Sequence, residues 1–134
     1  MMVSSPLFTT LNTVGNVMVE ACDPWWIIGS AAVALHSADA GDVADVDVLL
    51  SVADARSILR TIGIDLKPGS THAAFWSSIF GTWTGSTALL VEFMASFCHR
   101  LGEAWQPIQP ATRHCFDVGG TSVFVPEKPS YMQS

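Results

Sequence analysis

Two aspartates that stand one residue apart are the side chains in this sequence best suited to chemistry. Asp45 and Asp47 belong to the segment Asp45-Val46-Asp47-Val48, which has the β-branched and apolar content of a buried strand. Side chains on a strand alternate between its two faces, so both carboxylates point the same way. Like charges held this close are unfavourable unless a cation neutralises them, and Mg²⁺ commonly binds carboxylates together with substrate phosphates. The pair therefore predicts a metal site for a phosphate-bearing ligand.

A glycine and a serine supply a place for that phosphate. Gly29-Ser30 follows the short apolar run Trp25 to Ile28 and precedes an alanine-rich segment, so it stands where a strand turns into a helix. Glycine permits close backbone approach, and the free N–H groups of a helix N-terminus attract anions. Ser30 adds a hydroxyl group. Capping of the helix is an equally simple role for Ser30, and the two roles are compatible.

The elements that must position these residues follow from the spacing of apolar and turn residues. The sequence predicts helices from Ser5-Pro6 to about Ala21, from Ser30 to His36 and, behind a Ser51 and Asp54 capping box, to about Thr61. It also predicts two buried strands, two hairpins and the loop 37–44. The first of the two strands is expected to lie in the centre of its sheet. The strands are 25–28 and 45–50, and the hairpins pair 73–83 with 87–94 and 113–118 with 121–125.

These elements form one domain of α/β (α+β) class, a mixed sheet with helices packed on one side. We expect a core at 25–94, a C-terminal hairpin at about 105–125 and a frayed tail at 127–134.

The three cysteines lack CxxC spacing, and neither Cys98-His99 nor His114-Cys115 has the usual spacing of zinc ligands. We therefore expect free, mostly buried thiols in a reducing compartment.

Composition limits the partners. The net charge is −6 with six Lys and Arg, so nucleic acid is disfavoured as a substrate. No apolar run approaches the roughly 20 residues of a membrane span, and the start lacks the basic flank of a signal peptide, so a cytoplasmic protein is expected. The hydrophobic fraction is 49% with five tryptophans, which predicts a further partner surface, on a homodimer or against a helical protein. Trp76 and Trp83 are the candidates for stacking on a base.

The motifs resemble the polymerase-beta-type nucleotidyltransferase superfamily, in which an apolar strand, Gly-Gly or Gly-Ser, a helix and an Asp-apolar-Asp-apolar strand follow one another. Ile27-Ile28-Gly29-Ser30 and Asp45-Val46-Asp47-Val48 match that order. The superfamily carries a third carboxylate on a later strand, and Leu90-Val91-Glu92-Phe93 offers Glu92 there. The likeness covers 25–94, so the chain is similar to a minimal nucleotidyltransferase domain. Within 63–94, Lys67 is the one cation available to phosphates.

The resemblance implies a magnesium-dependent transfer of a nucleoside monophosphate from a triphosphate, such as ATP, to a small-molecule or protein hydroxyl. In that scheme Asp45 and Asp47 hold two Mg²⁺ ions, and Glu92 completes the attacking-side site and helps to deprotonate the acceptor. Gly29 and Ser30 bind the triphosphate. The alternative is a catalytically degenerate domain that acts as a nucleotide- or protein-binding module, such as an antitoxin-like partner. Convergence of Glu92 with the aspartates beside Ser30 favours the enzyme.

Overall fold

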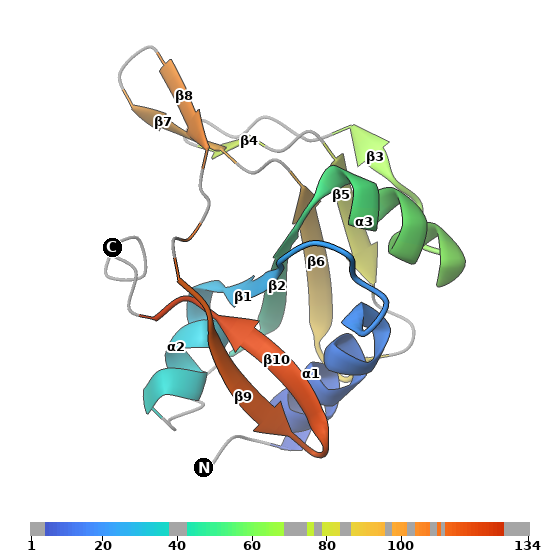
Figure 1. The fold of residues 1–134 in the computed structure, drawn as a ribbon, viewed down its shortest axis with the longest axis vertical. Helices are drawn as coiled ribbons and strands as arrows, with labels where there is room; N and C mark the ends of the chain where they lie inside the picture. Colours follow the sequence, from blue (N-terminus) through green and yellow to red (C-terminus); the bar gives the residue numbers. More distant parts are fainter. Residues whose placement is uncertain are drawn as a thin grey trace.

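A five-stranded mixed sheet forms the centre of the molecule, and helices pack on one of its faces (Figure 1). The strands lie in the order β1-β2-β6-β5-β3. Their bounds are Trp26–Ile28 (β1), Asp45–Leu50 (β2), Lys67–Pro68 (β3), Ile79–Trp83 (β5) and Leu90–Ala95 (β6). β2 and β6 are parallel, whereas β1 and β5 run antiparallel to their neighbours. The predicted α/β fold class, a mixed sheet with helices on one side, is confirmed.

The computed structural model describes residues 5–37, 43–68, 75–76, 79–83, 87–95, 98–101, 104–107, 110 and 112–127. Two smaller sheets accompany the large one, and one of them is the hairpin of β9 and β10. Its strands are His114–Val118 and Thr121–Val125, and those of the other sheet are Phe75–Trp76 (β4), Cys98–Leu101 (β7) and Ala104–Pro107 (β8). In the described part of the chain, no helix is long and apolar enough to cross a bilayer.

The helices bury their apolar stripes against one face of the large sheet. Helix α1 (Ser5–Met18) turns its buried residues inward at helical spacing, and helix α2 (Gly29–Ser37) does so mainly with alanines. Helix α3 (Val52–Asp54) continues into a π-helical turn, Ala55–Leu59. In α1 the inward residues are Leu7, Leu11, Val14 and Met18. The main core therefore lies between these helices, the sheet and the inner side of the β9–β10 hairpin.

The register divides the sheet residues between two faces. Val46, Val48 and Phe93 are fully buried against the helices. The opposite face carries a smaller apolar cluster of Trp26, Ile28, Leu49 and Met94, with Phe80 packed against it. The indole N–H of Trp26 donates a hydrogen bond of 3.1 Å to the carbonyl of Thr112, which ties the chain before β9 to this face. Asp45 and Asp47 alternate with Val46 and Val48, so they belong to this second face.

A buried carboxylate fixes the connection that leads into β1. The predicted cap is present, because the Asp54 N–H donates to the Ser51 hydroxyl at 3.1 Å. The Asp54 side chain is 3% exposed and accepts the backbone N–H groups of Cys22 and Asp23 at 3.0 and 2.9 Å. The Ser51 hydroxyl in turn donates to Asp23 at 2.7 Å. Asp54 is thus more than a helix-start residue, since it joins the start of α3 to the entry of β1.

Several sequence predictions hold and others need correction. The antiparallel pairing of β5 with β6 and the β9–β10 hairpin are confirmed. Helix α1 ends at Met18 rather than near Ala21, and β8 pairs with β7, so the C-terminal hairpin begins at His114 rather than near residue 105. Residues 128–134 of the predicted tail 127–134, the loop residues 38–42 and the Gly85-Ser86 turn lie outside the described residues.

Two further predictions were wrong for identifiable physical reasons. β1 stands at the end of its sheet rather than in the centre, and its burial comes from α2 and from β10 packed beside it. The three cysteines are free as predicted, but Cys22 and Cys115 are exposed and Cys98 is half-buried. Cys22 lies in a surface connection, and Cys115 lies on β9, which is mostly exposed. The general burial tendency of cysteine does not override these positions.

Candidate metal centre

Parallel pairing of β2 with β6 brings the third predicted carboxylate beside the first two. The register sets Asp47 opposite Glu92 and Asp45 opposite Leu90. Residues directly opposite each other on neighbouring strands project to the same face of a sheet. Glu92 therefore lies on the face that carries Asp45 and Asp47. About 45 residues of sequence separate Asp47 from Glu92, so only the sheet pairing brings them together.

The three side chains form one cluster of oxygen donors. One carboxylate oxygen from each of Asp45, Asp47 and Glu92 lies within 4.8 Å of the other two. All three side chains are half-buried, so they are accessible to an ion from solvent. Carboxylate oxygens in this number suit a hard divalent cation such as Mg²⁺, which also retains water and binds substrate phosphates. The residues present therefore fit the ion that the sequence predicted.

The electrostatics of the cluster also favour a cation. Burial, and after it the negative charges of Asp45 and Glu92, together raise the pKa of Asp47 from about 3.8 to about 7. The pKa of Glu92 is raised by burial and then by Asp45. Both shifts mean that the ionised cluster lacks sufficient compensating positive charge. A divalent cation at the centre would supply that charge and lower both pKa values.

Gly29 allows helix α2 to begin directly against Asp47. Ile28, the last residue of β1, pairs with Asp47, and Gly29 follows with a positive φ of 71°. A Cβ atom added at Gly29 would stand 2.9 Å from a carboxylate oxygen of Asp47, closer than real Cβ contacts. Only glycine combines this backbone conformation with this approach. The exposed Ser30 follows in the first turn of α2, so its hydroxyl and the helix start stand on the β1 side of the carboxylates.

Sequence reasoning missed Thr82, which the sheet places in the same row as the carboxylates. Thr82 pairs with Glu92 across β5 and β6, and it is exposed. The row across four strands is therefore Ile28, Asp47, Glu92 and Thr82. A threonine in a predicted strand carries no signal of this kind until the register is known. Its hydroxyl bounds the cluster on the side opposite to α2.

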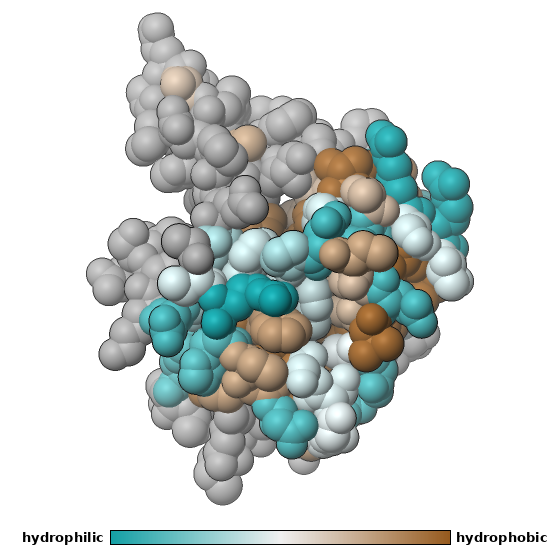
Figure 2. All heavy atoms as spheres, in the orientation of Figure 1, coloured by the Kyte–Doolittle hydropathy of each residue, from teal (hydrophilic) through white to brown (hydrophobic). Residues whose placement is uncertain are grey.

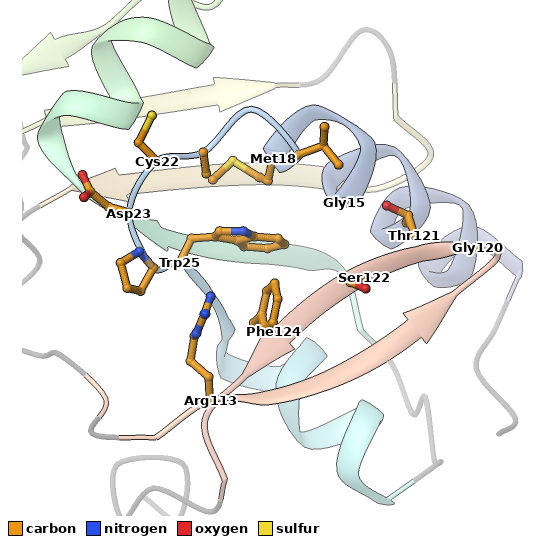
Figure 3. A pocket seen from close by; sticks show the side chains of 13 residues that line it. Gly15, Met18, Cys22, Asp23, Trp25, Arg113, Gly120, Thr121, Ser122 and Phe124 are labelled. Atoms are coloured by element: carbon orange, nitrogen blue, oxygen red, sulfur yellow. The ribbon is translucent and has the colours of Figure 1, made fainter.

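A cavity of about 590 Å³ lies elsewhere, between the end of α1, the connection before β1 and β10 (Figure 3). Its aromatic part is the ring of Trp25 meeting that of Phe124 edge-on at 5.5 Å, with the Arg113 guanidinium 4.0 Å from the Phe124 centroid. Trp25 precedes β1 and lies beside the Leu50 end of β2. The Asp45 end of β2 is about 16 Å away by strand rise. This cavity is therefore separate from the carboxylates, and none of them lines it.

Three features identify the fold class of this chain. They are the sheet order, the helix that begins at Gly29 and the carboxylate cluster. The chain has the nucleotidyltransferase fold, and solved structures of that class match most of its length. The resemblance inferred from the motifs of β1, α2 and β2 is thereby confirmed at the level of fold. No protein-family model matches the chain, and a search of curated proteins gives no match in sequence.

Particular structures can now be named. A candidate nucleotidyltransferase from Thermotoga maritima matches with a TM-score of 0.79 and 20% identity, over 98% of this chain and 86% of that one. A nucleotidyltransferase-like antigenic protein from Paracoccidioides brasiliensis matches with a TM-score of 0.55 and 20% identity, over 92% and 62%. ANT(2″)-Ia, in complex with adenylyl-2″-tobramycin, matches with a TM-score of 0.53 and 13% identity, over 90% and 68%. At this level of identity the likeness is one of fold.

Proposed function

We propose that the protein is a magnesium-dependent nucleotidyltransferase, which moves a nucleoside monophosphate from a nucleoside triphosphate to the hydroxyl of a small molecule or protein. The observation that carries this proposal is the convergence of Asp45, Asp47 and Glu92 within 4.8 Å beside the start of α2. A binding module has no need of the third carboxylate, whose crowding raises the pKa of Asp47. The convergence therefore favours the enzyme over a catalytically degenerate domain.

Each residue of the site has a role in this scheme. Asp45, Asp47 and Glu92 would hold the metal, and Glu92 lies on β6, on the side of β2 away from β1 and α2. The backbone at Gly29 and the Ser30 hydroxyl bind the triphosphate at the helix start. Two Mg²⁺ ions, when bound, supply positive charge that offsets the charge developing on the phosphate oxygens. Positioning and charge compensation account for most of the rate enhancement in phosphoryl chemistry of this kind.

The transfer is a single displacement at phosphorus. The acceptor hydroxyl oxygen forms a bond to the α-phosphorus of the triphosphate, and the bond from that phosphorus to the α,β-bridging oxygen breaks. Pyrophosphate leaves with the bonding electron pair. The hydroxyl proton passes to the carboxylate of Glu92, which acts as the general base.

Two observations bear on the acceptor. The net charge of −6 disfavours a nucleic-acid acceptor, because its phosphates would be repelled. The neighbour ANT(2″)-Ia was solved with adenylyl-2″-tobramycin, a nucleotidylated small molecule. Both support a small-molecule hydroxyl as the acceptor, with a protein hydroxyl as the second possibility.

Calorimetry with each nucleoside triphosphate, with and without Mg²⁺, tests the proposal. The wild-type protein is expected to bind at least one triphosphate only when Mg²⁺ is present. Asp47→Asn and Glu92→Gln should weaken this binding at least tenfold, because each removes a charged ligand atom. Asp117→Asn is the matched control, since Asp117 is exposed on β9 and the change in net charge is the same. Binding that is indifferent to Mg²⁺, or equal in all three variants, would refute the metal site.

Transfer itself is tested with a triphosphate labelled at the α-phosphate. The wild-type protein is incubated with this triphosphate and a cell extract, and labelled products are separated into small molecules and proteins. We expect a labelled acceptor that requires Mg²⁺ and is absent with Glu92→Gln. Tight Mg²⁺-dependent binding without any labelled acceptor would favour the binding module instead.

A further inference from the structure

The cavity of about 590 Å³ beside Trp25 has walls from three parts of the chain (Figure 3). Helix α1 and strand β10 are in close contact at Gly15, because a Cβ atom added there would lie 2.7 Å from the Thr121 side chain. Beyond this contact, the end of α1 and β10 form two walls of the cavity, and the connection 19–25 forms the third. Ligand pockets run from about 300 to 1,000 Å³, so a small organic molecule fits this space.

Arg113 gives the cavity a positive charge. Its guanidinium group lies 4.0 Å from the centroid of the Phe124 ring, and Figure 3 shows the side chain pointing into the space toward Trp25. Stacking on the ring orients the guanidinium group and leaves the N–H groups at its edge able to donate hydrogen bonds. Within the part of the chain that the structure describes, Arg113 forms no ion pair. Its charge is therefore available to an anion.

A hydroxyl group lies on the same wall as the stacked ring. Ser122 and Phe124 stand two residues apart on β10, so their side chains project from one face of the strand, about 7 Å apart along it. Ser122 is exposed and lines the cavity, so its hydroxyl can donate to an anion that Arg113 binds. Asp23 also lines the cavity, but its carboxylate accepts the Ser51 hydroxyl at 2.7 Å, and Figure 3 shows it pointing away from Arg113.

Apolar side chains border the same space. Val19 lines the cavity and is 73% exposed, more than any other large hydrophobic side chain among the described residues. The exposed Pro24 and the half-buried Phe124 add further apolar surface. Figure 2 shows hydrophobic and strongly hydrophilic side chains next to one another over α1 and the β9–β10 hairpin. Because covering Val19 removes apolar area from water, a ligand with an apolar body fits this surface better than a simple inorganic ion.

We propose that this cavity is a second ligand site, and that its ligand is a small organic anion, a carboxylate or phosphate attached to a ring or short hydrocarbon chain. Arg113 and Ser122 bind the anionic group, and Val19, Pro24 and Phe124 contact the apolar body. The site lies at the opposite end of β2 from Asp45, so it does not depend on the proposed nucleotidyl transfer.

Binding is measured in ¹H–¹⁵N spectra by the backbone amide signals of Gly120 and Ser122, two residues that line the cavity. Three probes are titrated: 3-phenylpropionate, phenyl phosphate and the uncharged 3-phenylpropan-1-ol. We expect at least one of the two anions to shift both signals with a Kd at least about fivefold below that of the alcohol, because Arg113 adds a charge-assisted hydrogen bond. Comparison of the two anions shows whether the site prefers a carboxylate or a phosphate.

Two variants test the two halves of the site. Arg113→Met removes the charge but keeps an apolar side chain against Phe124, so it should weaken the anions at least about fivefold and leave the alcohol unchanged. Arg56→Met is its control, because Arg56 is exposed on the turn 55–59. Val19→Ser should weaken all three probes by a similar factor, because it removes apolar surface. Val33→Ser, at an exposed valine of α2 outside the cavity, is the matched control and should change none of them.

The outcomes separate this inference from the proposed function. Anions that bind no better than the alcohol, or equally well to Arg113→Met and wild type, overturn the second site. So does the absence of any shift with either anion at millimolar concentration. Magnesium-dependent triphosphate binding, measured on the same samples, should be unchanged in Arg113→Met; its loss would assign the cavity to the triphosphate and also overturn the proposal. A wild-type protein that binds the anions but no triphosphate supports the second site and refutes the proposed function.

Discussion

Replacement of Asp47 by Asn should make the metal-free protein more stable at neutral pH while it abolishes metal binding. In the folded protein the pKa of Asp47 is raised from about 3.8 to about 7 by burial and by its two acidic neighbours. The unfolded chain therefore releases the proton near pH 4, and the folded chain releases it near pH 7. Between these values the folded state binds more protons, so stability falls as pH rises.

The size of the effect follows from the same shift. About 3 pKa units correspond to roughly 4 kcal/mol at 1.36 kcal/mol per unit, and relaxation around the charged group lowers this to an expected 1 to 4 kcal/mol. The neutral Asn side chain does not suffer this penalty. Asp47→Asn should therefore match the wild type at pH 4 and exceed it at pH 8. For a domain of this size, 1 kcal/mol raises the Tm by about 3 to 5 °C.

Urea unfolding followed by tryptophan fluorescence, in EDTA at pH 4.5 and pH 8, measures the difference between the two proteins. Asp117→Asn controls for the change in net charge. Addition of Mg²⁺ at pH 8 should stabilise the wild type in proportion to RT ln(1 + [Mg²⁺]/Kd) and leave Asp47→Asn unchanged. Equal stability of Asp47→Asn and wild type at pH 8 in EDTA would refute the argument that the carboxylate cluster is under electrostatic strain.

Three other substitutions are informative. Gly29→Ala should lower the free energy of unfolding by about 1 to 3 kcal/mol and weaken Mg²⁺ binding in calorimetry, because the new Cβ strains the backbone and pushes on Asp47. Gly120→Ala is the control, because Gly120 also has a positive φ but a Cβ there meets no other atom, so the Mg²⁺ affinity should be unchanged. Asp54→Ala should lower the free energy of unfolding, measured in urea, by about 2 to 3 kcal/mol. It should also speed amide exchange at residues 22 and 23, because their N–H groups lose their acceptor. Trp26→Phe should cost about 1 kcal/mol, because it removes the hydrogen bond to Thr112; an unchanged urea midpoint would show that this bond is not stabilising.

The site was predictable from sequence wherever the information was local. Asp45 and Asp47 share a face because strand side chains alternate, and Gly29 at the start of α2 lies next to Asp47 because β1, α2 and β2 follow one another in the sequence. Glu92 needed the resemblance to place it, since nothing local fixes which strand pairs with β2. Thr82 was missed for the same reason, because its importance depends on two successive registers.

The elements of the fold were likewise predictable where the information was local, and not where it depended on tertiary contacts. The period of the apolar residues located α1, β2 and both confirmed hairpins. It could not place β1 at the end of the sheet, because a strand buried by a helix has the same apolar composition as one buried between two strands. Exposure of Cys22 likewise depends on how the connection before β1 is held by Asp54, which is a tertiary contact.

The parallel pairing of β2 with β6 has a consequence for how the protein folds. Loop-closure entropy must be overcome before strands so distant in sequence can pair, so this contact is expected to form late. The partly folded chain then has Asp45 and Asp47 without Glu92 beside them. The full electrostatic repulsion among the three carboxylates arises only when β6 pairs with β2. A cation that needs all three groups would have little affinity for the folding transition state. Magnesium should therefore slow unfolding more than it speeds folding, and prolong the lifetime of the native protein in proportion to occupancy.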